Sequence, residues 1–442
     1  MRHIVYNFLL LTVLSSCKHD PTFEIQSLDE ELQSAIKRNS PTNDPKYFVM
    51  PESDDYKNLP NQDPHNPITK EKVALGKLLF FETGLAQTPK YPNCYETYSC
   101  SSCHVPSKGF LPGRFQGIAD GGYGYGTLGS SRSLADGYVE TEIDAQGNRP
   151  MTVMNVTYMT NTLWSGLFGA NDKNVGTQSL WVGLADVNHT GYAGLEAQNI
   201  EGFKLHRLAI NDKVLYTFGY SKLFDLAFSD LQKDKRYTPE TASFAMGAYL
   251  RTLLTNEAPF QRYLKGNPGA ISDSQKEGAL LFFGKAGCIS CHKSPSFSAM
   301  NFFTVGTKDM YQIGGLNTSA SDARIRGRGM FTGKAEDNYK FKVPQLYNLR
   351  DYVTFFHGSS KKSIREVVEY KLKAKSENPF VLDQDLDIKP KSLSAEEVNS
   401  LIDFLTNSLY DDYMNRYMPS SVLSGYCFPN NDLKSQKDTG CR

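Results

Sequence analysis

The sequence predicts a mainly α-helical protein in which one module occurs twice and long loops join the helices. Two short motifs carry most of this expectation. The pattern Cys-x-x-Cys-His begins at Cys100 and again at Cys288, and the run Leu-Leu-Phe-Phe precedes each copy. Apolar residues recur at helical spacing in several other segments, whereas the alternation typical of strands is scarce. We therefore expect two helical domains arranged as a degenerate repeat.

The composition is that of a globular protein of two or three domains. The 442 residues include 48 Lys+Arg against 48 Asp+Glu, and 40% are hydrophobic. This balance excludes disordered, collagen-like and coiled-coil proteins. Because the chain has neither a net positive charge nor a basic block, no nucleic-acid partner is expected.

Residues 1–17 are predicted to be a lipoprotein signal peptide. Arg2 and His3 precede an apolar run, 4–14, which has the length of a signal sequence and is too short to span a bilayer. The run ends at Cys17 in a sequence that resembles a bacterial lipobox, in which the cysteine carries the lipid. The alternative is an ordinary cleaved signal. We expect a cell-envelope protein, periplasm-facing or on the outer membrane, that is held to the membrane by a lipid anchor.

The two Cys-x-x-Cys-His motifs predict two covalently bound c-type haems. About 0.003 such motifs are expected by chance in a chain of this composition. On one helical turn both cysteines can form thioethers with a haem, and the histidine that follows can bind the iron from below. A redox dithiol or half a zinc site is the alternative. The expected haem-binding residues are Cys100, Cys103, His104, Cys288, Cys291 and His292, with the two histidines as proximal iron ligands.

A short helix is expected to lead into each motif. The first begins after Thr69, and the second begins at Ser274-x-x-Glu277, which has the form of a capping box. Further helices are expected over residues 241–254 and after Ser394. Ten glycines lie between the first motif and Pro150, which predicts a loop wrapped around a haem face.

The spacing of other residues supports a repeat. Pro150, Asn155 and Gly166 recur as Pro344, Asn348 and Gly358, at offsets of 192 to 194 residues. The expected divisions are a signal peptide (1–17), an N-terminal linker with a short helix (18–66), a first haem domain (67–205), a second haem domain (206–411) and a tail (412–442).

The tail holds two of the remaining cysteines. An exported protein can form disulfides, and Cys427 and Cys441 enclose a segment rich in turn-forming residues. We expect these two to form a disulfide, with Cys94 as the rival partner or as a free thiol.

Three further stretches resemble the bacterial dihaem cytochrome c peroxidases, a family that includes MauG-like oxidases. They are Leu75 to Phe81, Tyr249 to Phe260 and Phe341 to Gly358, and the similarity runs from about Pro67 to Leu409. The resemblance implies two cytochrome c-like domains, with electron entry at the second haem and peroxide cleavage at the first.

The function expected from this resemblance is reduction of hydrogen peroxide to water, with electrons from a small c-type cytochrome or a cupredoxin. The alternatives are a MauG-like oxidase that acts on a protein or organic substrate, and a dihaem electron carrier without catalysis. A homodimer and a Ca²⁺ ion between the domains are further expectations. Relatives hold Ca²⁺ partly through an asparagine where Arg149 stands here, and this weakens the calcium expectation.

The resemblance also implies roles for residues around the first haem. Trp164 matches a tryptophan that relays electrons between the haems. The usual motif of the acid that assists peroxide cleavage is absent, which leaves Glu196, Glu201 and His206 as candidates. Residues 105–150 contain no His, Met or Cys, so the first iron is expected to be open. The alternative is a distant ligand, His189 or His206.

The sixth ligand of the second haem is the remaining question. Counting from His357, the position where peroxidases of the family carry a methionine falls on Tyr370 or Lys371. A tyrosine serves in the related maturation enzyme, so Tyr370 is the preferred candidate. An anionic oxygen ligand would lower the potential of this haem relative to a thioether.

Overall fold

The computed structural model describes residues 27–441 and confirms a mainly helical protein with little sheet. The predicted lipobox lies outside these residues. Within them no helix has the length and apolar character needed to cross a membrane. The strands form two antiparallel pairs, β1 with β2 and β3 with β4. The elements are α1 (Leu28–Asn39), α2 (Lys70–Phe81), β1 (Gly122–Tyr123), β2 (Ser133–Leu134), α3 (Gly194–Leu205), α4 (Ser221–Ala227), α5 (Pro239–Arg251), α6 (Pro259–Leu264), α7 (Asp273–Phe283), β3 (Ala299–Thr304), α8 (Arg328–Thr332), β4 (Lys340–Val343), α9 (Ile364–Lys373), α10 (Ala395–Asp403) and α11 (Leu433–Thr439), with short 3₁₀ and π turns between them.

Side-chain caps set the starts of the helices. The Thr69 hydroxyl accepts a hydrogen bond from the Lys72 amide and begins α2, as the sequence predicts. Ser394 and Glu397 form the predicted capping box of α10. The start of α7 was predicted two residues too late, because Ser272 with Gln275 forms its capping box.

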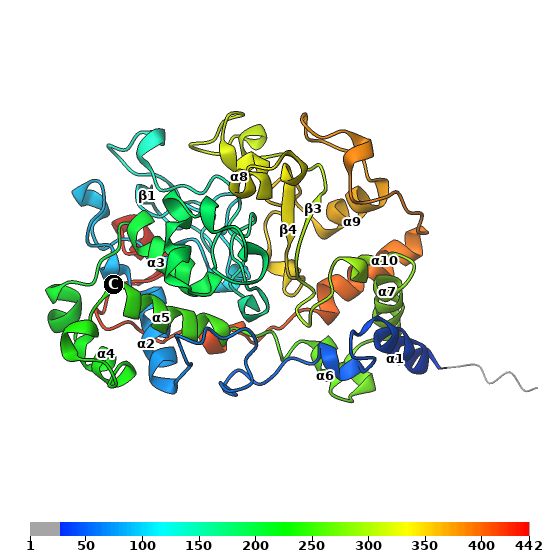
Figure 1. Cartoon of the computed structure of the whole chain (residues 1–442), viewed down its shortest axis with the longest axis horizontal. Helices are drawn as coiled ribbons and strands as arrows, with labels where there is room; N and C mark the ends of the chain where they lie inside the picture. The colour runs from blue at the N-terminus through cyan, green and yellow to red at the C-terminus, as the bar shows by residue number, and fades with distance from the viewer. Residues whose placement is uncertain (1–26, 442) are drawn as a thin grey trace, which may run out of the picture.

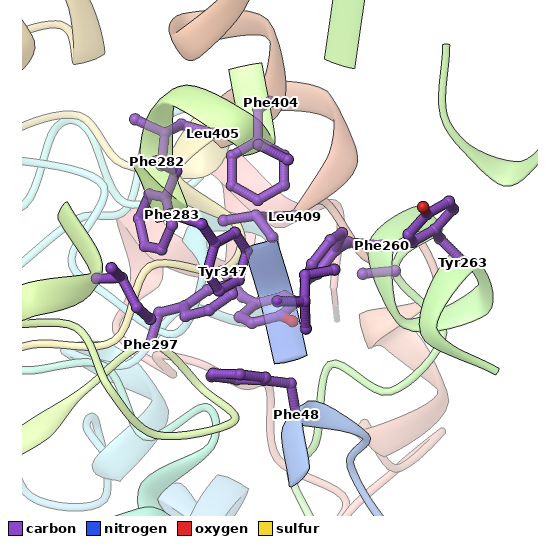
Figure 2. Packing of buried hydrophobic residues seen from close by; sticks show 14 of the residues in the cluster. Phe48, Phe260, Tyr263, Phe282, Phe283, Phe297, Tyr347, Phe404, Leu405 and Leu409 are labelled. Atoms are coloured by element: carbon purple, nitrogen blue, oxygen red, sulfur yellow. The ribbon is translucent and has the colours of Figure 1, made fainter. Parts of the chain in front are cut away.

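An aromatic core holds the second haem motif in place. Rings from α6, α7 and the π turn after α10 meet those of Phe297 and Tyr347, which stack with centroids 5.8 Å apart (Figure 2). Helix α1 also packs here, against α7, through the buried side chains of Leu32 and Ile36. The short helix expected within the N-terminal linker therefore packs on the same core as the second motif, and we call the elements around that core the second unit.

The elements around the first motif, which we call the first unit, are built around α2, which packs against α5 and α4 on the opposite side of the molecule from α7 and α10 (Figure 1). Because α5 follows the expected boundary at 205/206, the first unit includes chain from both sides of that point.

Glycine allows the closest helix crossing in both units. A Cβ atom on Gly76 of α2 would lie 1.9 Å from the Ala245 carbonyl oxygen of α5. A Cβ atom on Gly278 of α7 would lie 1.9 Å from the Ser400 carbonyl oxygen of α10. Both glycines stand five residues before the end of their Leu-Leu-Phe-Phe run. The helix that leads into each motif therefore crosses its neighbour in the same way.

The tail folds back onto the first unit, where Figure 1 also places the C-terminal end. Cys427 and Cys441 form a disulfide, and Cys94 is a buried free thiol. The Asp432 carboxylate accepts a hydrogen bond from the Gly124 amide (3.0 Å), and Asp438 accepts one from the Tyr125 amide (3.0 Å). The tail thereby fastens the glycine-rich loop that follows the first motif.

Candidate functional site

The two Cys-x-x-Cys-His segments have the same local fold. In the first, the His104 amide donates to the Cys100 carbonyl (3.1 Å), and in the second the His292 amide donates to the Cys288 carbonyl (3.1 Å). The four motif cysteines are free of disulfides. Each segment therefore presents two thiols and an imidazole from a single turn.

Both histidines are held in the orientation that an iron ligand needs. The His104 Nδ1 lies 3.0 Å from the Phe110 carbonyl oxygen, and the His292 Nδ1 lies 2.6 Å from that of Phe297. A carbonyl accepts a hydrogen bond from the protonated Nδ1, which leaves Nε2 with its lone pair for a metal. Burial lowers the pKa of both histidines to about 4, so both are neutral at pH 7.

A cavity of about 420 Å³ lies against the first motif and is lined by Cys100, Cys103 and His104. Four other lining residues carry a buried polar atom that has no partner among the described residues. An unpartnered buried polar group is costly, so these atoms indicate a bound group with polar substituents. With two thiols and a free imidazole nitrogen, the cavity fits a covalent haem. The four atoms are Tyr98 Oη, Gln146 Oε1, Arg149 Nη1 and Asn199 Nδ2.

The three candidate acids have different surroundings. Glu196 is fully buried and forms a two-pronged ion pair with Arg251, and Asn66 donates to the same carboxylate (2.9 Å). Glu201 pairs with Lys204 (2.6 Å). Neither glutamate lines the cavity, whereas His206 does.

Replacement of Glu196 by alanine should therefore affect stability. Removing one partner of a buried ion pair leaves the Arg251 charge uncompensated, so we expect a loss of about 3–5 kcal/mol in unfolding free energy. Glu201→Ala leaves only the Lys204 charge without a partner, and because that side chain is 68% exposed the loss should be less than about 1 kcal/mol. Urea unfolding of both variants measures the difference, and equal losses would contradict this assignment.

His206 forms a pair with an aspartate that sequence reasoning missed. Its Nδ1 lies 2.5 Å from Oδ2 of Asp144, which also lines the cavity. Burial lowers the pKa of His206, but Asp144 more than offsets this, so the net shift is upward. Asp144 lies in the glycine-rich loop, and its partner is 62 residues away in sequence, so no local pattern links them.

Trp164 lines the cavity and reaches toward the second unit. Its Nε1 donates to the Arg149 carbonyl (2.6 Å), and its ring meets that of His357 edge-on, with centroids 6.3 Å apart. Leu163 and Gly166 on either side adopt positive φ angles of 65° and 67°. A non-glycine residue in this conformation is strained, so the surrounding fold fixes the indole.

The structure shows the surroundings of His189, the alternative iron ligand, and of Arg149, on which the calcium expectation depends. His189 does not line the cavity, and its Nε2 lies 3.1 Å from the Trp181 carbonyl oxygen. At the position on which the calcium expectation depends, the Arg149 guanidinium lies over the rings of Trp164 and Tyr352. A fixed positive charge there disfavours a second cation.

Tyr370 and Lys371 are neighbours on α9 but have different surroundings. The buried Tyr370 hydroxyl donates to the Val305 carbonyl (2.6 Å), and burial raises its pKa above the usual range. Burial lowers the pKa of Lys371, and the nearby Cys291 and Cys288 partly offset this by raising it. Lys371 is therefore close to the second pair of thiols.

Comparisons with known proteins find similarity to one family. Residues 70–269 match the family model described as di-haem cytochrome c peroxidase. The methylamine utilization protein MauG of Methylorubrum extorquens is 27% identical over 78% of this chain and 81% of its own length. The cytochrome-c peroxidase IdrP1 of Pseudomonas sp. is 24% identical over 77% and 81%.

A solved structure shares the fold. The crystal structure of a MauG-like protein associated with microbial copper homeostasis aligns with a TM-score of 0.53 over 84% of this chain and 95% of that chain, at 22% sequence identity.

Proposed function

We propose that this chain is a member of the di-haem cytochrome c peroxidase family, which its similarity to that family supports. As a dihaem oxidoreductase it would reduce hydrogen peroxide to two waters, with two electrons from a small redox protein and two protons. The observation that carries this proposal is the cavity where Cys100, Cys103 and His104 meet the His206–Asp144 pair.

The residues that would hold the two haems are the cysteines and histidines of the two motifs. When bound, a haem iron with one protein ligand supplies a site for peroxide and a means to accept and pass on electrons. The rest of the site orients peroxide and moves protons. That the two haem units arose from one module is supported by the shared glycine crossing of Gly76 and Gly278.

His206 is proposed as the group that moves the proton. Its Nδ1 is held by Asp144, so Nε2 is free to take a proton from peroxide and return it to the departing oxygen. The paired carboxylate fixes the ring and stabilises its charged form, which makes Asp144 a positioning residue. Glu196 and Glu201 are not used in this scheme.

Trp164 is proposed to relay electrons from the second unit. Its indole lines the first cavity and contacts His357 of the second unit through its ring edge. Electrons would enter from a c-type cytochrome or a cupredoxin. We also propose that the protein is attached to the cell envelope through the lipidated Cys17.

Steady-state consumption of peroxide by the mature protein tests the function. Peroxide should disappear only when a reduced small cytochrome or cupredoxin is present. Consumption without a donor, together with oxidation of added protein or organic substrates, would indicate the oxidase instead. If peroxide is consumed under neither condition, the remaining function is that of a dihaem electron carrier without catalysis.

The as-isolated ferric protein should contain one high-spin haem and react with peroxide without a lag. We expect this because neither the glycine-rich loop up to Pro150 nor His189 offers an iron ligand at the cavity. Low-temperature EPR and stopped-flow mixing measure both properties. Two low-spin signals and a lag that a reductant removes would contradict the proposal and point to His206 or to Met151, which also lines the cavity.

Tyr370→Phe should change the optical and EPR spectra of the second haem only, because we propose Tyr370 as its sixth ligand. Ligation would require the iron to displace the phenol proton that now bonds the Val305 carbonyl. Lys371→Leu, which adds no group able to bind iron, is the matched control on the next residue. If Lys371→Leu changes the spectrum and Tyr370→Phe does not, lysine is the ligand.

A further inference from the structure

Two buried cations line the first cavity without a carboxylate partner. Arg149 and Lys342 are 5% and 1% exposed and come from distant parts of the chain. The Arg149 Nε donates to the Phe356 carbonyl (2.9 Å), and its Nη1 has no partner among the described residues. Among the described residues, the Lys342 ammonium donates a hydrogen bond to the Asn161 carbonyl (2.5 Å).

The charged groups elsewhere on the cavity wall are already paired. Asp144 is held by His206, and the Arg324 guanidinium forms an ion pair with Asp322 (Nε–Oδ2 2.8 Å). The cavity therefore has two positive side chains whose charge the described protein does not neutralise. Burying an uncompensated charge is expensive, so a bound group with two negative charges would complete the site.

A haem supplies that charge, since it carries two propionate groups on the edge away from its vinyl groups. With the vinyl edge bonded to Cys100 and Cys103, the propionates must meet other parts of the lining. We infer that Arg149 and Lys342 bind the propionates of the first haem, an inference that rests on the proposed haem in this cavity.

The surroundings of Trp164 fit this arrangement. The indole Nε1 donates to the Arg149 carbonyl, and the Lys342 amide donates to the Trp164 carbonyl (2.9 Å). Arg149 and Lys342 therefore both contact Trp164, Arg149 at the indole ring and Lys342 at the backbone carbonyl. Binding the propionates here orients that edge of the haem toward the proposed relay residue.

The protonation of Lys342 agrees with an anionic neighbour. Burial, with a smaller effect of Arg328, lowers the pKa of its ammonium to about 7. A propionate beside it would raise this pKa again and keep the amine charged at neutral pH.

Spectroelectrochemical titration of the holoprotein, without peroxide or donor, tests the inference. Lys342→Met keeps the length of the side chain and removes its charge, so an electron on the first haem loses a stabilising positive neighbour. We expect the ferrous-to-ferric ratio of the first haem at a fixed potential to fall about tenfold, which corresponds to about 59 mV for a one-electron couple. Arg149→Gln should act in the same direction.

The controls separate charge from packing. Arg149→Lys keeps the charge and should shift the ratio less than Arg149→Gln, and Arg324→Gln, which removes a paired cation of the same lining, should leave it unchanged. A second readout is the carboxylate infrared band of haem labelled with ¹³C in its propionates, which should shift in Lys342→Met.

Three results would overturn the inference: potentials equal to those of the wild type in both charge-removing variants, a shift confined to the second haem, or a mature protein without haem on Cys100 and Cys103. The last of these would also overturn the proposed function. Peroxide turnover with unchanged potentials would overturn only the propionate assignment, and shifted potentials without turnover would overturn only the peroxidase activity.

Discussion

Replacing Cys100 and Cys103 by alanine should abolish donor-dependent peroxide reduction and leave one covalent haem. The two thiols line the cavity in which His104 and His206 meet, so the site of peroxide cleavage would lose its attachment. The matched variant, with Cys288 and Cys291 replaced, should also keep one haem. It should still bind peroxide, but it should no longer accept electrons from the donor.

Mass spectrometry after acid–acetone extraction counts the haems, and rapid mixing with peroxide, with and without reduced cytochrome, separates the two losses. If both variants lost the same partial reaction, the assignment of peroxide cleavage to the first motif and electron entry to the second would be wrong. A wild-type protein with fewer than two covalent haems would contradict the reading of both motifs.

His206→Gln should lower kcat/KM for peroxide by about 10²- to 10⁴-fold, the usual contribution of a positioned acid–base group. The wild-type rate should fall as the pH drops through the pKa of His206, because only the neutral ring can take the proton. Asp144 holds that pKa above its ordinary value. In Asp144→Asn burial and the nearby Arg207 act alone and lower it, so the acidic limb of the pH–rate profile should move to lower pH.

Glu201→Gln is the control, since Glu201 lies on α3, which ends just before His206, but does not line the cavity. An unchanged rate in His206→Gln would exclude this histidine as the proton carrier. Conversion of a low-spin first haem to high-spin in the same variant would instead identify His206 as an iron ligand.

Local patterns allowed the haem motifs and the helix starts to be predicted from the sequence. Thr69 and Ser394 bond to amides three residues ahead, and each motif histidine bonds a carbonyl five or six residues away. All of these contacts lie within one or two turns of chain. Helical periodicity similarly located α5 to within three residues at each end.

The remaining parts of the site depend on contacts between distant segments. Asp144 meets His206 across 62 residues, and the Lys342 ammonium meets the Asn161 carbonyl across 181. Glu196 has the carboxyl group that a catalytic acid needs, but it is paired with Arg251. That pairing is set by the packing of α3 on α5, which the sequence does not reveal. The residues next to Asp144 in its loop and next to Lys342 in its strand do not indicate which distant residue either one contacts.

The tail that fastens the first unit also sets an order on synthesis. Ser102, inside the first haem motif, donates to the Pro429 carbonyl, 327 residues further along the chain. That partner is therefore made, and can reach the site of folding, only after the motif. The turn that carries Cys100 and Cys103 lacks its outer cover until then. Haem attachment can take place while the thiols are still accessible, and the arrival of the last segment then encloses the bound group.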